Sequence, residues 1–162
     1  MTIPVTTAQA RRAEITQALQ AETGIDEAMI ERLVRGFYAR VREDSTLGPI
    51  FAARIEDWEP HFQRMCAFWS SVVLMSGRYH GQPMRKHLPL PIDGRHFDHW
   101  LTLFETAARE LCPPAAAEVF IERSRRIAES LELGLAMGQG RLLRRGERLR
   151  RPELDAASAV PA

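Results

Sequence analysis

The stretch 26-DEAMIERLVRGFYARVRED-44 decides the fold class, because its apolar side chains recur at the spacing of an α-helix. Seven apolar or aromatic residues fall on one face of that helix: Met29, Ile30, Leu33, Val34, Phe37, Tyr38 and Val41. Asp26 suits the N-cap position, and Gly48 with Pro49 predicts a corner at residues 47–51. The stretch therefore predicts a long amphipathic helix that ends near Asp44.

The same helical spacing continues along the chain, and no stretch alternates apolar and polar residues as a strand would. Further helices are expected at residues 7–21, 58–76, 84–88, 94–111 and 114–137. Asp57 and Asp93 precede two of them as N-caps, and Pro89 ends the shortest. The sequence therefore predicts an all-α fold.

The composition is that of an ordinary globular domain. The 162 residues are 45% hydrophobic and 27% charged, with a net charge of +1, which gives no reason to expect nucleic-acid binding. The two cysteines, Cys66 and Cys112, read as reduced thiols. Residues 1–20 lack the apolar run of a signal peptide, and no apolar stretch reaches the length of a membrane span. We expect a cytoplasmic protein.

His87 lies in the shortest predicted helix, beside the apolar residues Met84 and Leu88. One or two helical turns are too short to be stable alone, and a metal–imidazole bond would anchor them. The preceding long helix carries His61 at the start of an apolar and aromatic face. Two histidines on facing helices with such a lining suit a flat hydrophobic cofactor such as haem. The alternative, more common for any single histidine, is a structural or solvent-facing role.

Tyr38 and Trp100 are candidate hydrogen-bond donors inside such a pocket. A tyrosine on the core-facing side of a helix needs a hydroxyl partner, or desolvation costs about 1–3 kcal/mol. Its hydroxyl would either reach the helix edge or donate to a bound dioxygen. Trp100 is either a core side chain or a second donor, since its indole N–H can only donate.

Two further features have simpler explanations. His96 and His99 have the helical spacing of a metal site, but His99 points away from the core if Trp100 faces it. The arginines between residues 141 and 151 could contact an anionic surface, but Glu147 interrupts them and no aromatic residue is interleaved. We expect solvated histidines and a flexible tail, with neither nucleic-acid nor membrane binding.

Four segments, in order and at compatible spacing, resemble group III truncated haemoglobins. The segments 36-GFYARVRED-44 and 47-LGPIF-51 resemble the second helix and the following corner of that family, and 77-GRYHGQPMRKH-87 resembles its approach to the proximal histidine. Trp58, His61, Phe68 and Trp69 fit its distal helix, and 96-HFDHWL-101 with Phe104 resembles the next helix. The similarity covers about residues 25–135.

The resemblance implies a sandwich of two helices over two and a haem b cofactor. The chain would then comprise an N-terminal extension with an extra helix (1–24), a truncated-globin haem domain (25–137) and a flexible arginine-rich tail (138–162). His87 would be the proximal iron ligand and His61 the distal histidine. The full set expected to bind the cofactor is Tyr38, Phe51, His61, Met65, Trp69, Met84, His87 and Trp100.

The resemblance also implies binding of dioxygen, nitric oxide and carbon monoxide. Two or three donors at the ligand would slow its release by roughly one to three decades. We therefore expect redox chemistry with nitric oxide or peroxide, as a nitric oxide dioxygenase or a peroxidase-like enzyme, or else sensing, rather than bulk oxygen transport. The electron donor is left open, and a monomer or weak dimer is expected. The alternatives are a haem-free interaction or regulatory module and a bundle that binds non-haem metal through His96 and His99.

Overall fold

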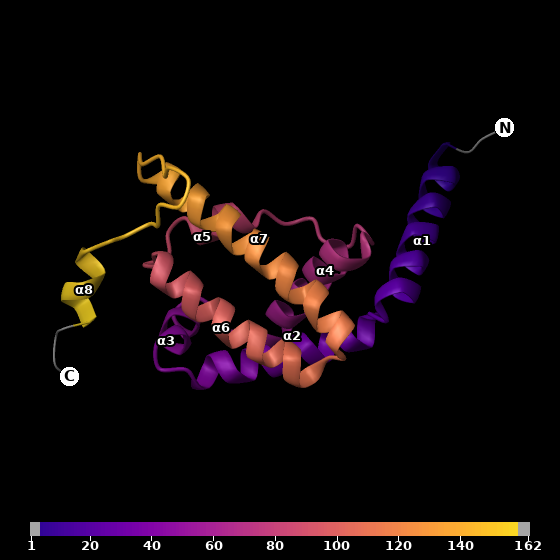
Figure 1. Cartoon of the computed structure of the whole chain (residues 1–162), viewed down its shortest axis with the longest axis horizontal. Helices are drawn as coiled ribbons and strands as arrows, with labels where there is room; N and C mark the ends of the chain where they lie inside the picture. The colour runs from indigo at the N-terminus through magenta and orange to yellow at the C-terminus, as the bar shows by residue number, and fades with distance from the viewer. Residues whose placement is uncertain (1–3, 159–162) are drawn as a thin grey trace.

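The computed structural model describes residues 4–158, and all regular structure within that range is helical, which confirms the predicted all-α class (Figure 1). The helices are α1 (Pro4–Thr23), α2 (Glu27–Glu43), α3 (Leu47–Ala52), α4 (Trp58–Leu74), α5 (Pro83–His87), α6 (Gly94–Leu111), α7 (Pro114–Gly138) and α8 (Glu153–Ser158).

Aspartate side chains begin three of the long helices, as the sequence predicts. The Asp26 carboxylate accepts a hydrogen bond from the Met29 backbone N–H at 2.8 Å at the start of α2. Asp57 and Asp93 accept comparable bonds at the starts of α4 and α6. Each carboxylate satisfies a backbone donor that the helix itself leaves unpaired, so these caps fix where the helices begin.

Two layers of two helices form the body of the protein. Helices α2 and α4 pack together, as do α6 and α7, and the layers meet where α2 contacts α6 and α4 contacts α7. Aromatic side chains fill the junction: the ring of Phe104 stacks on Trp69 at 5.0 Å and on Trp100 at 5.1 Å. The predicted two-over-two sandwich is therefore the observed arrangement.

The expected corner at residues 47–51 is a short helix instead. Pro49 lies in the first turn of α3, where its missing N–H has no helical partner to lose. Gly48 packs so closely against the end of α2 that a Cβ there would lie 3.1 Å from the carbonyl oxygens of Val41 and Arg42. Glycine and proline thus make a tight α2–α3 connection without preventing helix formation.

Residues 148–151 of the expected tail pack against the body of the protein. Leu149 is fully buried in a small apolar cluster with Ile92 and Phe97, and Arg148 pairs with the buried Glu132 at 3.0 Å. One leucine within an arginine-rich run has no periodic signal, so its burial was not predictable from pattern alone. The additional helix α8 follows, and residues 159–162 of the expected tail lie outside the described residues.

Helix α1 forms the extra N-terminal helix and stands out from the body at the end opposite to α8 (Figure 1). Its C-terminal half joins the fold, where the Thr16 hydroxyl donates to the Leu74 carbonyl at 2.8 Å. Residues 1–3 of the expected extension lie outside the described residues. Within residues 4–158, no helix combines the length and apolar character of a membrane span.

Candidate functional site

A cavity of about 430 Å³ opens between the two helical layers and the short helices α3 and α5. Seven residues of the expected cofactor-binding set line it: Tyr38, Phe51, His61, Met65, Trp69, His87 and Trp100. They come from α2, α3, α4, α5 and α6. The fold thus brings together side chains that are separated by up to 62 residues in the chain, from Tyr38 to Trp100.

Met84 is the one member of the expected set that the structure places elsewhere. It is not among the cavity-lining residues. Its side chain packs on Gly134 of α7, where an added Cβ would lie 2.1 Å from the Met84 methyl carbon. Met84 therefore attaches α5 to α7, and Gly134 leaves the space for it.

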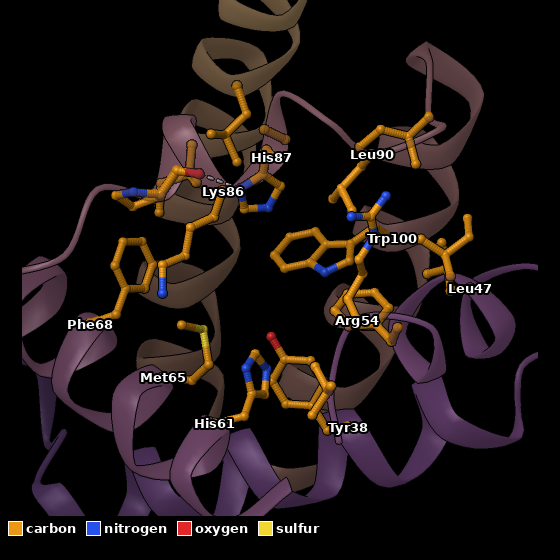
Figure 2. A pocket seen from close by; sticks show the side chains of 18 of the residues that line it. Tyr38, Leu47, Arg54, His61, Met65, Phe68, Lys86, His87, Leu90 and Trp100 are labelled. Atoms are coloured by element: carbon orange, nitrogen blue, oxygen red, sulfur yellow. Dashed lines mark hydrogen bonds between the residues drawn. The ribbon is translucent and has the colours of Figure 1, made fainter. Parts of the chain in front are cut away.

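The ring of His87 points into the cavity from α5 (Figure 2). Its Nδ1 lies 2.6 Å from the Pro83 carbonyl oxygen, one helical turn earlier. A carbonyl oxygen only accepts, so in the neutral imidazole Nδ1 carries the proton and Nε2 keeps its lone pair. This is the arrangement in which a backbone acceptor orients an imidazole that binds a metal.

Tyr38 and His61 face His87 from the opposite side of the cavity (Figure 2). Their rings meet edge to face at 4.8 Å. The Nε2 atom of His61 is buried and has no hydrogen-bond partner among the described residues. Burial, together with the positive charges of Arg64 and Lys86, lowers the pKa of His61 to about 4, so the ring is neutral near pH 7. Burial raises the pKa of Tyr38, which therefore keeps its hydroxyl proton as a donor.

Trp100 lines the same cavity and is held in place by other aromatic rings. Its indole is stacked on Phe104 and meets Phe37 edge to face at 5.2 Å. Figure 2 shows the indole at the side of the cavity between His87 and Tyr38. A ring fixed on two sides presents its donor N–H in a defined direction.

Three cations at the cavity were not anticipated: Arg54, Arg64 and Lys86. Arg64 follows His61 by three residues on α4, and Lys86 precedes His87, so helical spacing and adjacency could have indicated both. Arg54 follows α3 and donates to the Pro89 carbonyl at 3.2 Å, which only the tertiary fold brings near. The cavity therefore combines an apolar and aromatic lining with three positively charged side chains.

His96 and His99 have separate partners and do not form a metal site together. His96 lines the cavity and accepts a hydrogen bond from the Asp93 backbone N–H at 3.0 Å. His99 does not line the cavity and lies 2.8 Å from the carboxylate of Asp44, which also accepts a hydrogen bond from the Leu47 backbone N–H. Across the described residues, no group of three or more His, Cys, Asp or Glu side chains could hold a metal ion.

These residues fit a flat metal-containing group with acidic substituents. His87 offers a free imidazole lone pair on one side, and the unpartnered Nε2 of His61 and the hydroxyl of Tyr38 face it from the other. The apolar and aromatic lining suits a macrocycle, and the cations suit carboxylates. A two-over-two helical sandwich with this site is a globin.

Comparison with known proteins gives the family. The chain belongs to the bacterial-like globins, whose family model matches residues 19–131, and within them it is a group III truncated haemoglobin. It is 35% identical over 113 residues to the group 3 truncated hemoglobin ctb of Campylobacter jejuni, covering 67% of this chain and 89% of that protein. The crystal structure of the group III truncated hemoglobin from Campylobacter jejuni matches with a TM-score of 0.64 at the same identity and coverage.

A more distant relative is the group 2 truncated hemoglobin YjbI of Bacillus subtilis. It is 29% identical over 85 residues, which cover 51% of this chain and 64% of that protein. Membership of the globins implies a haem cofactor and the binding of small gaseous ligands such as oxygen. The C-terminal third of α7 and everything after residue 131 lie outside the family match.

Proposed function

We propose that the cavity holds haem b through His87 and that the protein uses it for redox chemistry with nitric oxide or peroxide, or for sensing, rather than for bulk oxygen transport. The observation that carries this proposal is the pairing of His87 Nδ1 with the Pro83 carbonyl, which leaves Nε2 free opposite the unpartnered Nε2 of His61 and the ring of Tyr38 beside it. Haem supplies an iron centre that binds diatomic gases and exchanges electrons with them.

The ligand side of the cavity favours retention of a polar diatomic molecule. Tyr38 keeps its proton, because burial raises its pKa, and Trp100 carries a donor-only N–H. His61 is neutral near pH 7 and can donate or accept at Nε2. Hydrogen bonds contribute about 0.5–1.5 kcal/mol each, and more to a partly charged acceptor, so two would slow release by a decade or more. Slow release suits reaction or sensing better than delivery.

Three positively charged side chains suit the carboxylates of a haem group such as haem b, because those carboxylates need counter-charges. Arg54, Arg64 and Lys86 all line the cavity. Removal of one such charge weakens electrostatic attraction, while the apolar lining continues to hold the ring. The three cations are therefore expected to orient the group, and His87 to hold its metal.

Hemin titration of the purified protein tests the proposal. A strong Soret band should develop at one equivalent in the wild-type chain, and His87→Gly should abolish the normal spectrum until imidazole is added. His99→Ala is the matched control, since His99 pairs with Asp44 outside the cavity. Failure of the wild-type chain to bind hemin would favour a haem-free interaction or regulatory module.

A second measurement, with a chemical reductant in place of an electron-donor protein, tests the reaction. The protein reduced with dithionite and then exposed to oxygen should consume nitric oxide in a stopped-flow experiment, and the ferric protein should oxidise a peroxidase dye with hydrogen peroxide. Absence of both activities would leave sensing as the surviving part of the proposal. Rapid oxygen release, without either activity, would contradict the proposal and favour transport.

A further inference from the structure

Residues 148–151, which we name the strap, lie outside the part of the chain that matches the family model and contact the segment that follows His87. Arg148 Nε lies 3.0 Å from the carboxylate of Glu132, and the Leu149 backbone N–H donates to the same carboxylate at 2.8 Å. Glu132 belongs to α7 and is 6% exposed. A buried carboxylate without such donors would be strongly unfavourable, so Glu132 and the strap depend on each other.

The strap also completes the N-terminus of α6. The Gly94 backbone N–H donates to the Leu149 carbonyl at 2.8 Å, and the Arg151 backbone N–H donates to the fully buried Asp93 carboxylate at 3.1 Å. A Cβ on Gly94 would lie 3.1 Å from the Leu149 carbonyl oxygen and 3.0 Å from a carboxylate oxygen of Glu132. The absence of a side chain at Gly94 thus permits the close contact between the start of α6 and the strap.

The side chain of Leu149 supports the cavity wall from behind. It is 0% exposed and packs in one cluster with Ile92 and Phe97. Both of these residues line the cavity. Truncation of Leu149 would therefore loosen two wall residues without touching the cavity itself.

A short series of hydrogen bonds connects the strap to His87. A guanidinium N–H of Arg151 donates to the Leu90 carbonyl at 2.9 Å, and the Leu90 backbone N–H donates to the His87 carbonyl at 3.0 Å. Helix α5 is only five residues long and cannot fix His87 by its own stability. The segment after His87 therefore contacts both α7, where Leu88 packs on Gly138, and the strap, where Arg151 bonds to Leu90.

We propose that the strap positions the His87-bearing segment and thereby sets how slowly the cavity releases haem. This inference rests on the proposed function, because it concerns retention of the same group. The residues of the strap act through Leu90, Ile92, Asp93 and Phe97, so they are positioning residues and do not themselves meet the cofactor.

The test compares Leu149→Ala with Leu142→Ala, a leucine in the same tail that is 81% exposed, and with Leu33→Ala, a buried leucine of the main core. Hemin release is measured by transfer to an excess of a haem-scavenging protein, and backbone hydrogen exchange is followed over residues 88–94. Leu149→Ala should release hemin at least about tenfold faster and exchange faster over those residues, because the cavity-lining Ile92 and Phe97 lose the side chain on which they pack. Leu142→Ala should match the wild-type chain, and Leu33→Ala should not accelerate exchange over residues 88–94 selectively.

A change in the iron–histidine stretching band in the Raman spectrum of ferrous Leu149→Ala would show altered positioning of His87, which general destabilisation does not produce. Wild-type release and exchange in Leu149→Ala would overturn the inference, as would equal effects in Leu33→Ala. If Leu149→Ala does not fold, Arg151→Ala removes the side-chain bond to the Leu90 carbonyl together with an ion pair to the exposed Glu153. An exposed pair contributes little, so loss of the Leu90 bond should still accelerate release about threefold; no acceleration overturns the inference.

The experiments distinguish an error in the proposed function from an error in the inference about the strap. If the wild-type chain binds no hemin, the proposed function is wrong, yet exchange over residues 88–94 in the hemin-free protein still decides whether the strap holds that segment. If hemin binds and the strap variants behave as the wild-type chain does, the inference about the strap is wrong and the proposed function stands.

Discussion

Replacing Tyr38 by phenylalanine removes one oxygen atom and leaves the surrounding ring contacts in place. The ring of Tyr38 meets Phe37 at 5.0 Å, His61 at 4.8 Å and Phe51 at 5.7 Å, and phenylalanine preserves the shape that fills this space. The substitution therefore isolates the hydroxyl, whose pKa is raised by burial alone.

The magnitude follows from one lost hydrogen bond. A neutral bond contributes about 0.5–1.5 kcal/mol, and a bond to a charged acceptor about 1.5–3 kcal/mol. At 1.4 kcal/mol for each factor of ten, oxygen should leave Tyr38→Phe roughly twofold to hundredfold faster than the wild-type chain. In the hemin-free protein, Tyr38 lines the cavity and its hydroxyl makes no hydrogen bond with the described residues, so Tyr38→Phe should change the free energy of unfolding by less than about 1 kcal/mol.

Stopped-flow oxygen release from the ferrous protein and urea unfolding of the hemin-free protein measure these two effects. Tyr79→Phe is the control, since Tyr79 also lines the cavity but its ring packs on Phe68 at 5.3 Å, away from His61. Tyr79→Phe should leave release unchanged. An unaltered release rate in Tyr38→Phe would refute the role of Tyr38 as a donor, whatever the unfolding data show.

Three further predictions concern His87, His61 and Asp93. His87→Gly should eliminate the normal Soret spectrum and recover it with added imidazole, while His99→Ala keeps the wild-type spectrum; normal ligation in His87→Gly would exclude His87 as the ligand. The pKa of His61 is about 4 in the folded chain and near 6.5 in the unfolded chain. The unfolded chain therefore takes up the proton first as the pH falls, and the free energy of unfolding of the hemin-free protein should decrease by up to about 3 kcal/mol between pH 6.5 and pH 4. His61→Leu should lose less over that range in urea unfolding, and an equal loss would refute the attribution. Burial opposes ionisation of Asp93, but hydrogen bonds from Arg95 and the Arg151 N–H outweigh it and lower its pKa, so Asp93→Ala should reduce the free energy of unfolding at pH 7 by roughly 2–4 kcal/mol. That difference should narrow as the pH falls below 3.8, because Asp93 of the unfolded chain protonates there while the folded chain keeps the carboxylate ionised to a lower pH. A constant difference would contradict the argument.

Local sequence rules were sufficient for the helices of the main fold. Apolar spacing predicted α2, and the N-caps at Asp26, Asp57 and Asp93 located three helix starts. These features depend on neighbours within a few residues, so a single sequence contains the information. The mistaken corner at α3 shows the limit, because Pro49 breaks a helix only when it falls beyond the first turn.

Features that depend on partners far away in the chain were harder to predict from the sequence. His87, His61, Tyr38 and Trp100 could be brought together only because helical faces and a family resemblance agreed on one cavity. Leu149 had no such support, since its burial depends on Ile92 and Phe97 far earlier in the chain.

The cavity contains a polar atom that the folded chain leaves unsatisfied. His61 Nε2 is buried without a hydrogen-bond partner among the described residues. Such an atom destabilises the hemin-free protein by about 1–3 kcal/mol, so a sequence selected for stability alone would replace His61 with an apolar residue. A polar occupant between His61 and His87 would recover that cost, and the Tyr38 ring, which meets His61 edge to face, would bring a second donor beside it. The group that weakens the empty fold is therefore expected to favour, in the filled cavity, a diatomic ligand that accepts hydrogen bonds.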